Sequence, residues 1–313
     1  MDRLRILAET TGSFTRADAL ECGYDDKAIA RAIRVKLWTR IRTGAYTFSD
    51  LWSQADELAR HRASARAVMK RLGTNVALSH VSAAVDHGLT AWNADLSQVH
   101  VTRLDGGAGR TEAGVVHHEG FCLDDDVIEH DGYLVVKPAR ATLETGSMLT
   151  TEAAIALFDD GLHKRRFTVG ELEAAFCLMQ SWPAFRKLQI AVRFADGRAE
   201  SLGESRTRYL CHVQGLPAPQ LQYDVFDQHG RLIGTTDFAW PEYRLLGEFD
   251  GKIKYGRLLK PGQDPGDVVF NEKVREDRLR EALQWAMVRI IWAELYRGAE
   301  TAARIRRLMR AAA

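Results

Sequence analysis

Hydrophobic and polar positions along the first fifty residues are spaced in a way that predicts short helices followed by a β-hairpin. Ile29, Ile33 and Leu37 recur every four residues, which places them on the buried face of one helix. Thr43-Gly44 is a turn signal between two short apolar segments. The predicted order is a helical turn from Leu4 broken by Gly12, a helix over 16–21 capped by Thr15 and ended by Gly23, a helix after Asp25 or Asp26, and strands over 38–41 and 45–48.

From residue 51 to 195 the pattern is mixed, and after that it changes again. A polar, Arg-rich helix is predicted over 52–72, and short strands and helices alternate from there to Ser181-Trp182-Pro183, a candidate boundary. The last segment predicts a helix over 204–215, three strands over 220–226, 232–240 and 243–250, a long charged helix over 267–287, and a final strand or helix start over 288–295.

The length and composition fit this division. The chain has 313 residues, which suits two or three domains, and its 46% hydrophobic and 27% charged residues are globular composition. We therefore predict a multidomain α/β protein with parts 1–50, 51–195 and 196–313. The formal net charge is +1, so an argument for nucleic acid has to rest on local clusters and not on an overall basic excess.

Cysteine spacing and apolar stretches bear on the compartment. Cys22, Cys122, Cys177 and Cys211 are far apart and form no CxxC pair, which predicts free thiols in a reducing compartment. The first residues lack the apolar stretch of a secretory signal, and no apolar stretch reaches the length of a membrane span. We expect a cytoplasmic protein that does not enter a membrane.

The third predicted helix and the hairpin after it are strongly basic, with no acid from residue 27 to 42. Lys27, Arg31 and Arg34 are spaced four and three apart, so they share one helix face. This arrangement is typical of a DNA recognition helix, and the hairpin would be its wing. A basic face that is only solvated is the alternative. The candidate nucleic-acid-binding residues are Lys27, Arg31, Arg34, Lys36, Arg40 and Arg42.

The segment from Gly12-Ser-Phe-Thr to Thr43-Gly-Ala-Tyr46 resembles the winged-helix domain of abortive-infection type E antitoxins. Residues 76–145, with Ser79-His80 and Val99-His-Val-Thr102, are similar to the middle region of that family, more weakly. The resemblance implies a domain that binds operator DNA and represses its own operon. It also makes a cognate toxin a candidate partner.

Two carboxylates stand in apolar strands of the last segment. Asp237 lies within Ile233-Gly-Thr-Thr-Asp-Phe-Ala-Trp240, and Glu248 lies within Leu245-Leu-Gly-Glu-Phe-Asp250. A carboxylate in such a strand needs compensation of its charge. A short hairpin would bring the two side by side, where Mg²⁺ would offset their repulsion and could activate a water against a phosphodiester. The alternative is a structural salt bridge to Arg206, Arg208 or Arg275.

The segment Asp237-Phe-Ala-Trp…Leu246-Gly-Glu-Phe-Asp-Gly-Lys252 resembles the PD-(D/E)XK nucleases, and looks most like the branch related to very-short-patch repair endonucleases. The resemblance covers roughly 110 residues and implies a restriction-endonuclease-like αβββαβ domain that uses Mg²⁺ or Mn²⁺. It implies Asp237 and Glu248 as metal ligands and Glu204 as an accessory acid. The family's lysine two residues after the second acid is replaced by Asp250, so Lys252, or Lys273, would have to supply its charge.

Two other signals carry less weight. Adjacent His117 and His118 in a predicted strand point to opposite faces, which argues against a shared metal ion. Ser79-His80 has no evident acid partner, so a Ser–His hydrolase is not supported. Two functions stay open. One is a DNA-binding protein with a metal-dependent endonuclease domain, acting in phage defence, DNA repair or a toxin–antitoxin setting. The other is a non-enzymatic repressor with a degenerate nuclease fold.

Overall fold

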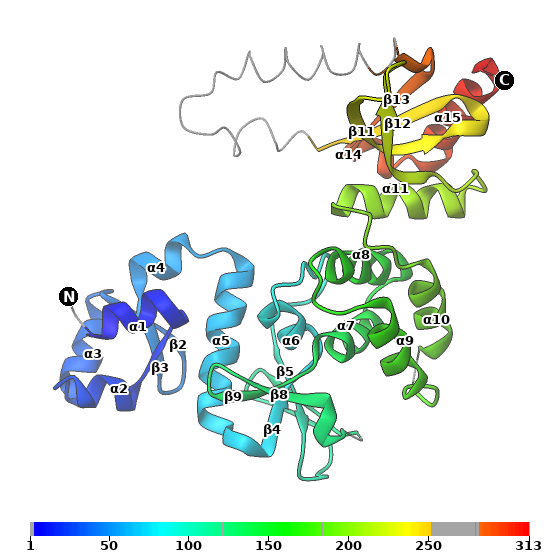
Figure 1. Ribbon diagram of the computed structural model, residues 1–313. Coiled ribbons are helices and arrows are strands. Elements are labelled where there is room, and N and C mark those ends of the chain that lie inside the picture. Colours follow the sequence, from blue (N-terminus) through cyan, green and yellow to red (C-terminus); the bar gives the residue numbers. More distant parts are fainter. Residues whose placement is uncertain (1–2, 121, 183, 252–278, 280–281, 313) are drawn as a thin grey trace. The chain divides into compact units, whose positions relative to one another are not determined.

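The computed structural model describes residues 3–120, 122–182, 184–251, 279 and 282–312. In this part of the chain the protein is mixed α/β and has three separate sheets (Figure 1). The chain divides into two compact units. Unit 1 is Met1–Leu157 with Arg165–Arg193, and unit 2 is Phe158–Lys164 with Phe194–Ala313. The winged-helix segment and the middle region predicted from the sequence both lie within unit 1.

The first part of unit 1 alternates short helices and strands: α1 (Arg3–Thr11), β1 (Phe14–Thr15), α2 (Arg16–Glu21), α3 (Asp26–Arg34), β2 (Trp38–Arg42) and β3 (Ala45–Phe48). The sheet has the order β1-β3-β2 and both pairs are antiparallel. Leu4, Phe14 and Trp38 are buried beneath it, and the rings of Phe14 and Trp38 meet edge to face with centroids 4.8 Å apart. These aromatic contacts hold α3 and the β2–β3 hairpin on one small core.

Local signals explain where these helices begin and end. Thr15 caps α2 through a reciprocal pair of hydrogen bonds with Asp18, and Asp25 caps α3 by accepting from the Ala28 amide at 2.7 Å. The expectation that Leu37 belongs to the core is wrong, because its side chain is 51% exposed. The helix ends at Arg34 and the next turn has a positive φ, so the four-residue spacing does not continue.

The rest of unit 1 is built on a six-stranded mixed sheet. Its first elements are α4 (Ser49–Gln54), α5 (Glu57–Leu72), β4 (Val76–Leu78), α6 (His80–Asp86), β5 (Val99–Arg103), β6 (Arg110–Glu112), β7 (Val115–His118), β8 (Val127–His130), β9 (Tyr133–Val136) and α7 (Pro138–Met148). The strand order is β6-β7-β5-β4-β9-β8. Val68 and Met69 of α5 belong to the same buried cluster as Val101 and Val135 of the sheet. The single helix expected over 52–72 is two helices, because residue 55 is extended and Asp56 caps α5.

Three more helices lead towards unit 2: α8 (Thr151–His163), α9 (Val169–Cys177) and α10 (Phe185–Phe194). Thr168 and Glu171 form a capping box at the start of α9. The first seven residues of α8, 151–157, belong to unit 1, and the rest of this helix belongs to unit 2.

Unit 2 has a four-stranded sheet between helices. Its elements are α11 (Leu202–Val213), β10 (Gln220–Phe226), β11 (Leu232–Trp240), β12 (Leu245–Asp250), β13 (Ala286–Ile291), α14 (Trp292–Leu295) and α15 (Gly298–Ala312). The order is β10-β11-β12-β13, with the first two pairs antiparallel and β12 parallel to β13. The long helix expected over 267–287 lies mostly outside the described residues, but 286 and 287 belong to a strand. Gly203 lets α11 approach β12, since a Cβ there would lie 1.9 Å from the Phe249 ring.

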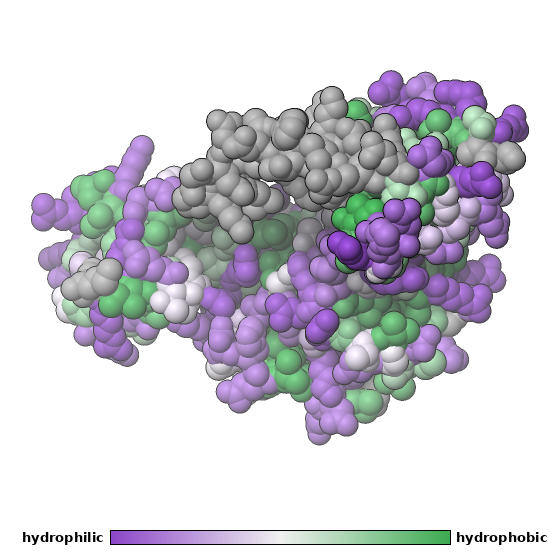
Figure 2. Space-filling model, turned by 45° about the horizontal axis from the view of Figure 1, so that its top comes forward, coloured by the Kyte–Doolittle hydropathy of each residue, from purple (hydrophilic) through white to green (hydrophobic). Residues whose placement is uncertain are grey.

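The described surface is mixed in polarity. None of the helices between residues 3 and 312 that the structure describes is long and apolar enough to cross a membrane. Hydrophilic and hydrophobic residues are interspersed over the face seen in Figure 2.

Candidate nucleic-acid interface and acid cluster

One side of α3 is buried and the other carries cations. Ile29 and Ala32 are buried at 4% exposure each, while Lys27, Arg31 and Arg34 are exposed. The cations therefore lie away from the core, as their spacing predicts. Lys36, in the turn after α3, and Arg40 of β2 are exposed as well. We call Lys27, Arg31, Arg34, Lys36 and Arg40 the basic surface.

The basic surface is not neutralised from within the protein. Among the residues that the structure describes, none of its five side chains has a hydrogen-bond or ion-pair partner. The nearest acid on the same helix, Asp26, is already paired with Arg16 of α2 at 2.7 Å, and this hydrogen bond lowers the pKa of Asp26. The positive charge of the surface is therefore available to an external anion.

Arg42 differs from the other predicted DNA-binding residues. Its guanidinium is half-buried and donates a hydrogen bond to the carbonyl of Ala113, in the turn between β6 and β7. Burial, and next the charge of Arg71, lower the pKa of Arg42. This contact fixes the base of the wing to the middle region, so the structure gives Arg42 a partner inside unit 1.

Glu204 sits at the start of α11, where the sequence placed an accessory acid. Ser201 caps the helix, and Glu204 accepts hydrogen bonds from the Ser201 hydroxyl at 2.7 Å, the Glu200 amide at 3.0 Å and the Gln222 side chain at 3.1 Å. Its side chain is buried, and this burial raises the pKa of Glu204. The three donors hold Glu204 in place at the end of the helix.

Asp237 and Glu248 lie on paired neighbouring strands. Phe238 of β11 opposes Gly247 of β12, so Asp237 and Glu248 occupy the next position of the hairpin. Asp237 Oδ2 accepts a hydrogen bond from the Phe249 amide at 2.7 Å, and Glu248 is buried with 6% exposure. The structure thus brings these two predicted ligands together.

A cation from the adjacent strand faces this pair. Arg289 of β13 opposes Glu248 in the parallel register, with Nη2 at 3.5 Å from Glu248 Oε2 and Nη1 at 3.9 Å from Asp250 Oδ2. An ion pair of the structural kind therefore exists at Glu248, with a partner other than those considered from the sequence. Arg208 pairs with Asp159 instead, Arg206 lies over the Tyr296 ring, and Arg275 lies outside the described residues.

The donor set can be compared with the needs of Mg²⁺. Asp237 and Glu248 supply carboxylate oxygens, and Mg²⁺ in proteins is often held by one or two carboxylates with waters. The pair fits such an ion in donor chemistry, with Arg289 as a competing positive charge. Within the described residues, no group of three His, Cys, Asp or Glu side chains is arranged to hold a metal ion, so Glu204 does not complete a three-ligand site there. Lys252 and Lys273, expected to supply the missing lysine charge, lie outside the described residues.

Sequence reasoning missed two features of these sites. Arg289 carries the same signal as the acids, a charge within an apolar strand, but its partner lies 41 positions away in the chain. The acid partner missing for Ser79-His80 is Glu144, which accepts from the His80 amide at 2.9 Å. Both Ser79 Oγ, at 3.1 Å, and Glu144 Oε2, at 3.4 Å, face the same ring nitrogen of His80. A Ser–His–acid relay needs the two nitrogens to serve different partners, so this arrangement is structural.

The two adjacent histidines separate as the sequence predicts. His117 lies on the side of β7 that faces α5 and lines a pocket there. His118 stacks on His80 with ring centroids 3.6 Å apart, and its Nε2 lies 2.9 Å from His100 Nδ1.

Comparisons with known proteins add relatives without a stated activity. No protein-family model matches the chain. The uncharacterized proteins MT2308 and Rv2248 of Mycobacterium tuberculosis are each 32% identical over 160 residues, or 51% of this chain and 55% of theirs. The chain thus spans about half the length of the curated relatives it matches. The crystal structure of the RV2827C protein of M. tuberculosis is 15% identical, covers 65% of this chain and 78% of that one, and has a TM-score of 0.37, too low to support an argument.

Proposed function

We propose that the first fifty residues bind double-stranded DNA, with α3 in the major groove and the basic surface against the phosphates. The observation that carries this proposal is the basic surface itself: five exposed cations without an internal partner in the described structure, on and beside a short helix whose other side is buried. A solvated cation gives up only counterions and water when it meets a phosphate, so binding there is electrostatically favoured.

The order of elements suits this mode of binding. Three helices followed by a hairpin place α3 on the surface of the small core, with Arg40 on the adjacent strand β2. In winged-helix and helix-turn-helix domains the corresponding helix enters the major groove. The resemblance to antitoxin winged helices supports duplex DNA, and in particular the protein's own upstream region, as the first target to test.

The test is fluorescence anisotropy of the full chain with a labelled duplex from its own upstream region and a scrambled duplex of the same length. Affinity should fall steeply with salt, and the double variant Arg31→Ala, Arg34→Ala should weaken binding roughly tenfold or more. It should also reduce the slope of log affinity against log salt by about 2. Arg186→Ala is the matched control, because Arg186 is an exposed arginine of α10 outside the winged helix. Equal losses in the control and the double variant would contradict an interface at α3.

A second candidate function concerns the acid pair of unit 2. Asp237 and Glu248 stand at neighbouring positions of paired strands, and Glu248 is buried in an apolar segment. We propose on this observation that unit 2 cleaves phosphodiesters with Mg²⁺ or Mn²⁺. Such an ion, when bound, supplies an activated water and stabilises charge on the phosphate.

The chain's own residues would divide the remaining tasks. The Phe249 amide orients Asp237 through its hydrogen bond, leaving the second carboxylate oxygen on the other side. Arg289 holds Glu248 and Asp250 in position when no ion is bound. Glu204, fixed by three donors, would assist from α11, and Lys252 would supply positive charge in place of the family's lysine.

Plasmid nicking measures this activity directly. Supercoiled DNA incubated with the full chain should be nicked with Mg²⁺ or Mn²⁺ and not with EDTA, and Asp237→Ala or Glu248→Gln should abolish nicking. Asp224→Ala is the control, since Asp224 is an exposed acid of the same sheet on β10. If no variant or metal changes the plasmid while duplex binding persists, the chain is a repressor without nuclease activity, which Asp250 at the lysine position favours.

A further inference from the structure

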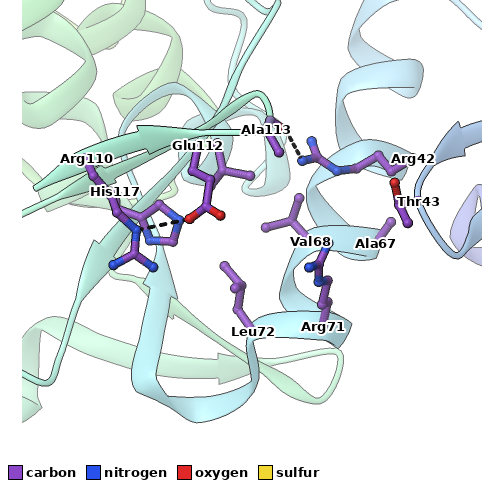
Figure 3. A pocket seen from close by; sticks show the side chains of 11 residues that line it. Arg42, Thr43, Ala67, Val68, Arg71, Leu72, Arg110, Glu112, Ala113 and His117 are labelled. Carbon is purple, nitrogen blue, oxygen red and sulfur yellow. Dashed lines mark hydrogen bonds and ion pairs between the residues drawn. The ribbon is translucent and has the colours of Figure 1, made fainter.

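A pocket of about 250 Å³ opens between three elements of unit 1: the β2–β3 hairpin, α5 and the β6–β7 hairpin (Figure 3). Its lining contains three arginines, Arg42, Arg71 and Arg110, and one carboxylate, Glu112. Glu112 is paired with Arg110 at 3.2 Å on the β6–β7 side of the pocket. The lining is therefore electropositive, and the charges of Arg42 and Arg71 have no acid of the lining left to neutralise them.

Arg42 and Arg71 repel one another across this recess. Arg42 donates to the carbonyl of Ala113, which is an uncharged acceptor, and its pKa is lowered by burial and then by the charge of Arg71. Arg71 is exposed, and within the described ranges its side chain has no hydrogen bond or ion pair. Two half-solvated guanidinium groups that face one opening are a suitable pair of donors for a tetrahedral anion.

The remaining lining is apolar or neutral. Val68 and Leu72 of α5 and Val115 of β7 form an apolar wall beside the arginines. His117 is buried, and burial lowers its pKa, so it adds a neutral ring with one donor to the same side. The volume lies just below that of pockets for drug-sized ligands, so a compact ligand is required.

We propose that this pocket binds a small phosphate monoester, with the phosphate between Arg42 and Arg71 and the organic part against the apolar wall. The ligand would join β2 to α5 and to the β6–β7 hairpin, because its phosphate would contact cations from the wing and from the middle region. It would therefore fix the wing at its base. Arg42 serves the ligand in this arrangement, and the basic surface remains free for DNA, so the two sites are separate.

Isothermal titration calorimetry on the full chain tests the site with three probes: inorganic phosphate, ribose 5-phosphate and ribose. Ribose 5-phosphate should bind saturably with one site per chain, inorganic phosphate more weakly, and ribose not at all. Arg71→Ala should weaken ribose 5-phosphate binding about tenfold or more, the effect of losing one charge-assisted contact. Arg71→Lys should retain part of the affinity, because the charge stays while the planar fork is lost.

Arg31→Ala is the matched control, because it removes one exposed and unpaired arginine of the same unit outside the pocket. It should leave ribose 5-phosphate affinity within about twofold and weaken duplex binding, while Arg71→Ala should do the reverse. The proposal is overturned if no saturable binding of ribose 5-phosphate appears, if Arg71→Ala binds it as the unchanged protein does, or if Arg31→Ala loses as much. It is also overturned if Arg71→Ala impairs only duplex binding, since Arg71 would then contact the DNA backbone.

Discussion

The basic surface of unit 1 and the acid pair of unit 2 are both concentrations of like charge, but their surroundings are opposite. The five cations are exposed and have no side-chain partner in the described residues. Glu248 is buried and faces Arg289, and Asp237 accepts a main-chain hydrogen bond. A solvated charge is free to exchange water for a ligand, whereas a buried charge must first be balanced within the fold. Binding at the first surface is therefore separable from stability, and chemistry at the second is not.

The strongest way to break this comparison is to remove a buried charge that has only a structural role. Asp159 is fully buried and accepts from Arg208 Nη1 and from the Asp196 amide, each at 2.7 Å. Asp159→Ala would leave Arg208 uncompensated, and we expect a loss of about 3–5 kcal/mol in the free energy of unfolding. Urea denaturation measures it, with Asp105→Ala, an exposed member of a surface pair, as the control. A loss below about 1 kcal/mol in Asp159→Ala would show that burial does not bind charges to the fold as argued.

Gly203 sharpens the comparison by testing the packing that holds the acid cluster. A Cβ at this position would lie 1.9 Å from Cε1 of the Phe249 ring, so Gly203→Ala must push α11 and β12 apart. We expect a loss of about 1–3 kcal/mol, the usual cost of overpacking. Gly170→Ala in α9 is the control, because a Cβ there meets nothing within 4 Å. If both variants unfold at the same urea concentration, the close approach of α11 to β12 is not what positions Glu204.

Buried histidines give unit 1 a pH dependence that the basic surface lacks. Burial, and next the charge of His80, lower the pKa of His100 to about 3. Between pH 6.5 and 3 the unfolded chain binds a proton at His100 that the folded chain does not, so this group's contribution to stability is lost as the pH falls. The contribution at pH 5.5 should be about 1.4 kcal/mol lower than at neutral pH. The measurement is the pH dependence of urea denaturation for the protein and for His100→Gln, and parallel curves would contradict it.

The smallest expected effect on stability belongs to the basic surface itself. Arg31→Ala with Arg34→Ala should leave the urea midpoint unchanged, because neither side chain has a partner to lose within the described structure. The same variant should lose duplex affinity, as proposed above. A clear drop in the midpoint would mean that these arginines stabilise α3, and the solvated-charge argument would fail there.

The sequence predicted features that depend on neighbours in the chain. Spacing placed Lys27, Arg31 and Arg34 on the exposed face of α3, and alternation placed Asp237 and Glu248 on strands of one hairpin. The mixed α/β class with several sheets is also confirmed. Local rules act over a few residues, so the periodicity that they produce can be recognised without a structure.

Contacts between distant segments could not be predicted in this way. The partners of Arg208, His80 and Glu248 come from other helices or strands, and nothing in the local pattern distinguishes Asp159 or Glu144 from a solvated acid. Arg42 shows the reverse case: it belongs to a basic run, yet tertiary packing turns it to the Ala113 carbonyl. Lys252 stays a prediction, because it lies outside the described residues.

The path of α8 has a consequence for dividing the protein into fragments. The chain contributes Phe158–Lys164 to unit 2, returns to unit 1 over Arg165–Arg193, and only then completes unit 2. A fragment that begins at residue 196 keeps Arg208 but lacks Asp159, its partner. Proteolysis or gene truncation at the obvious boundary would therefore separate a buried ion pair along with the units. A genetic fusion or split of this protein preserves unit 2 only if the chain begins before α8.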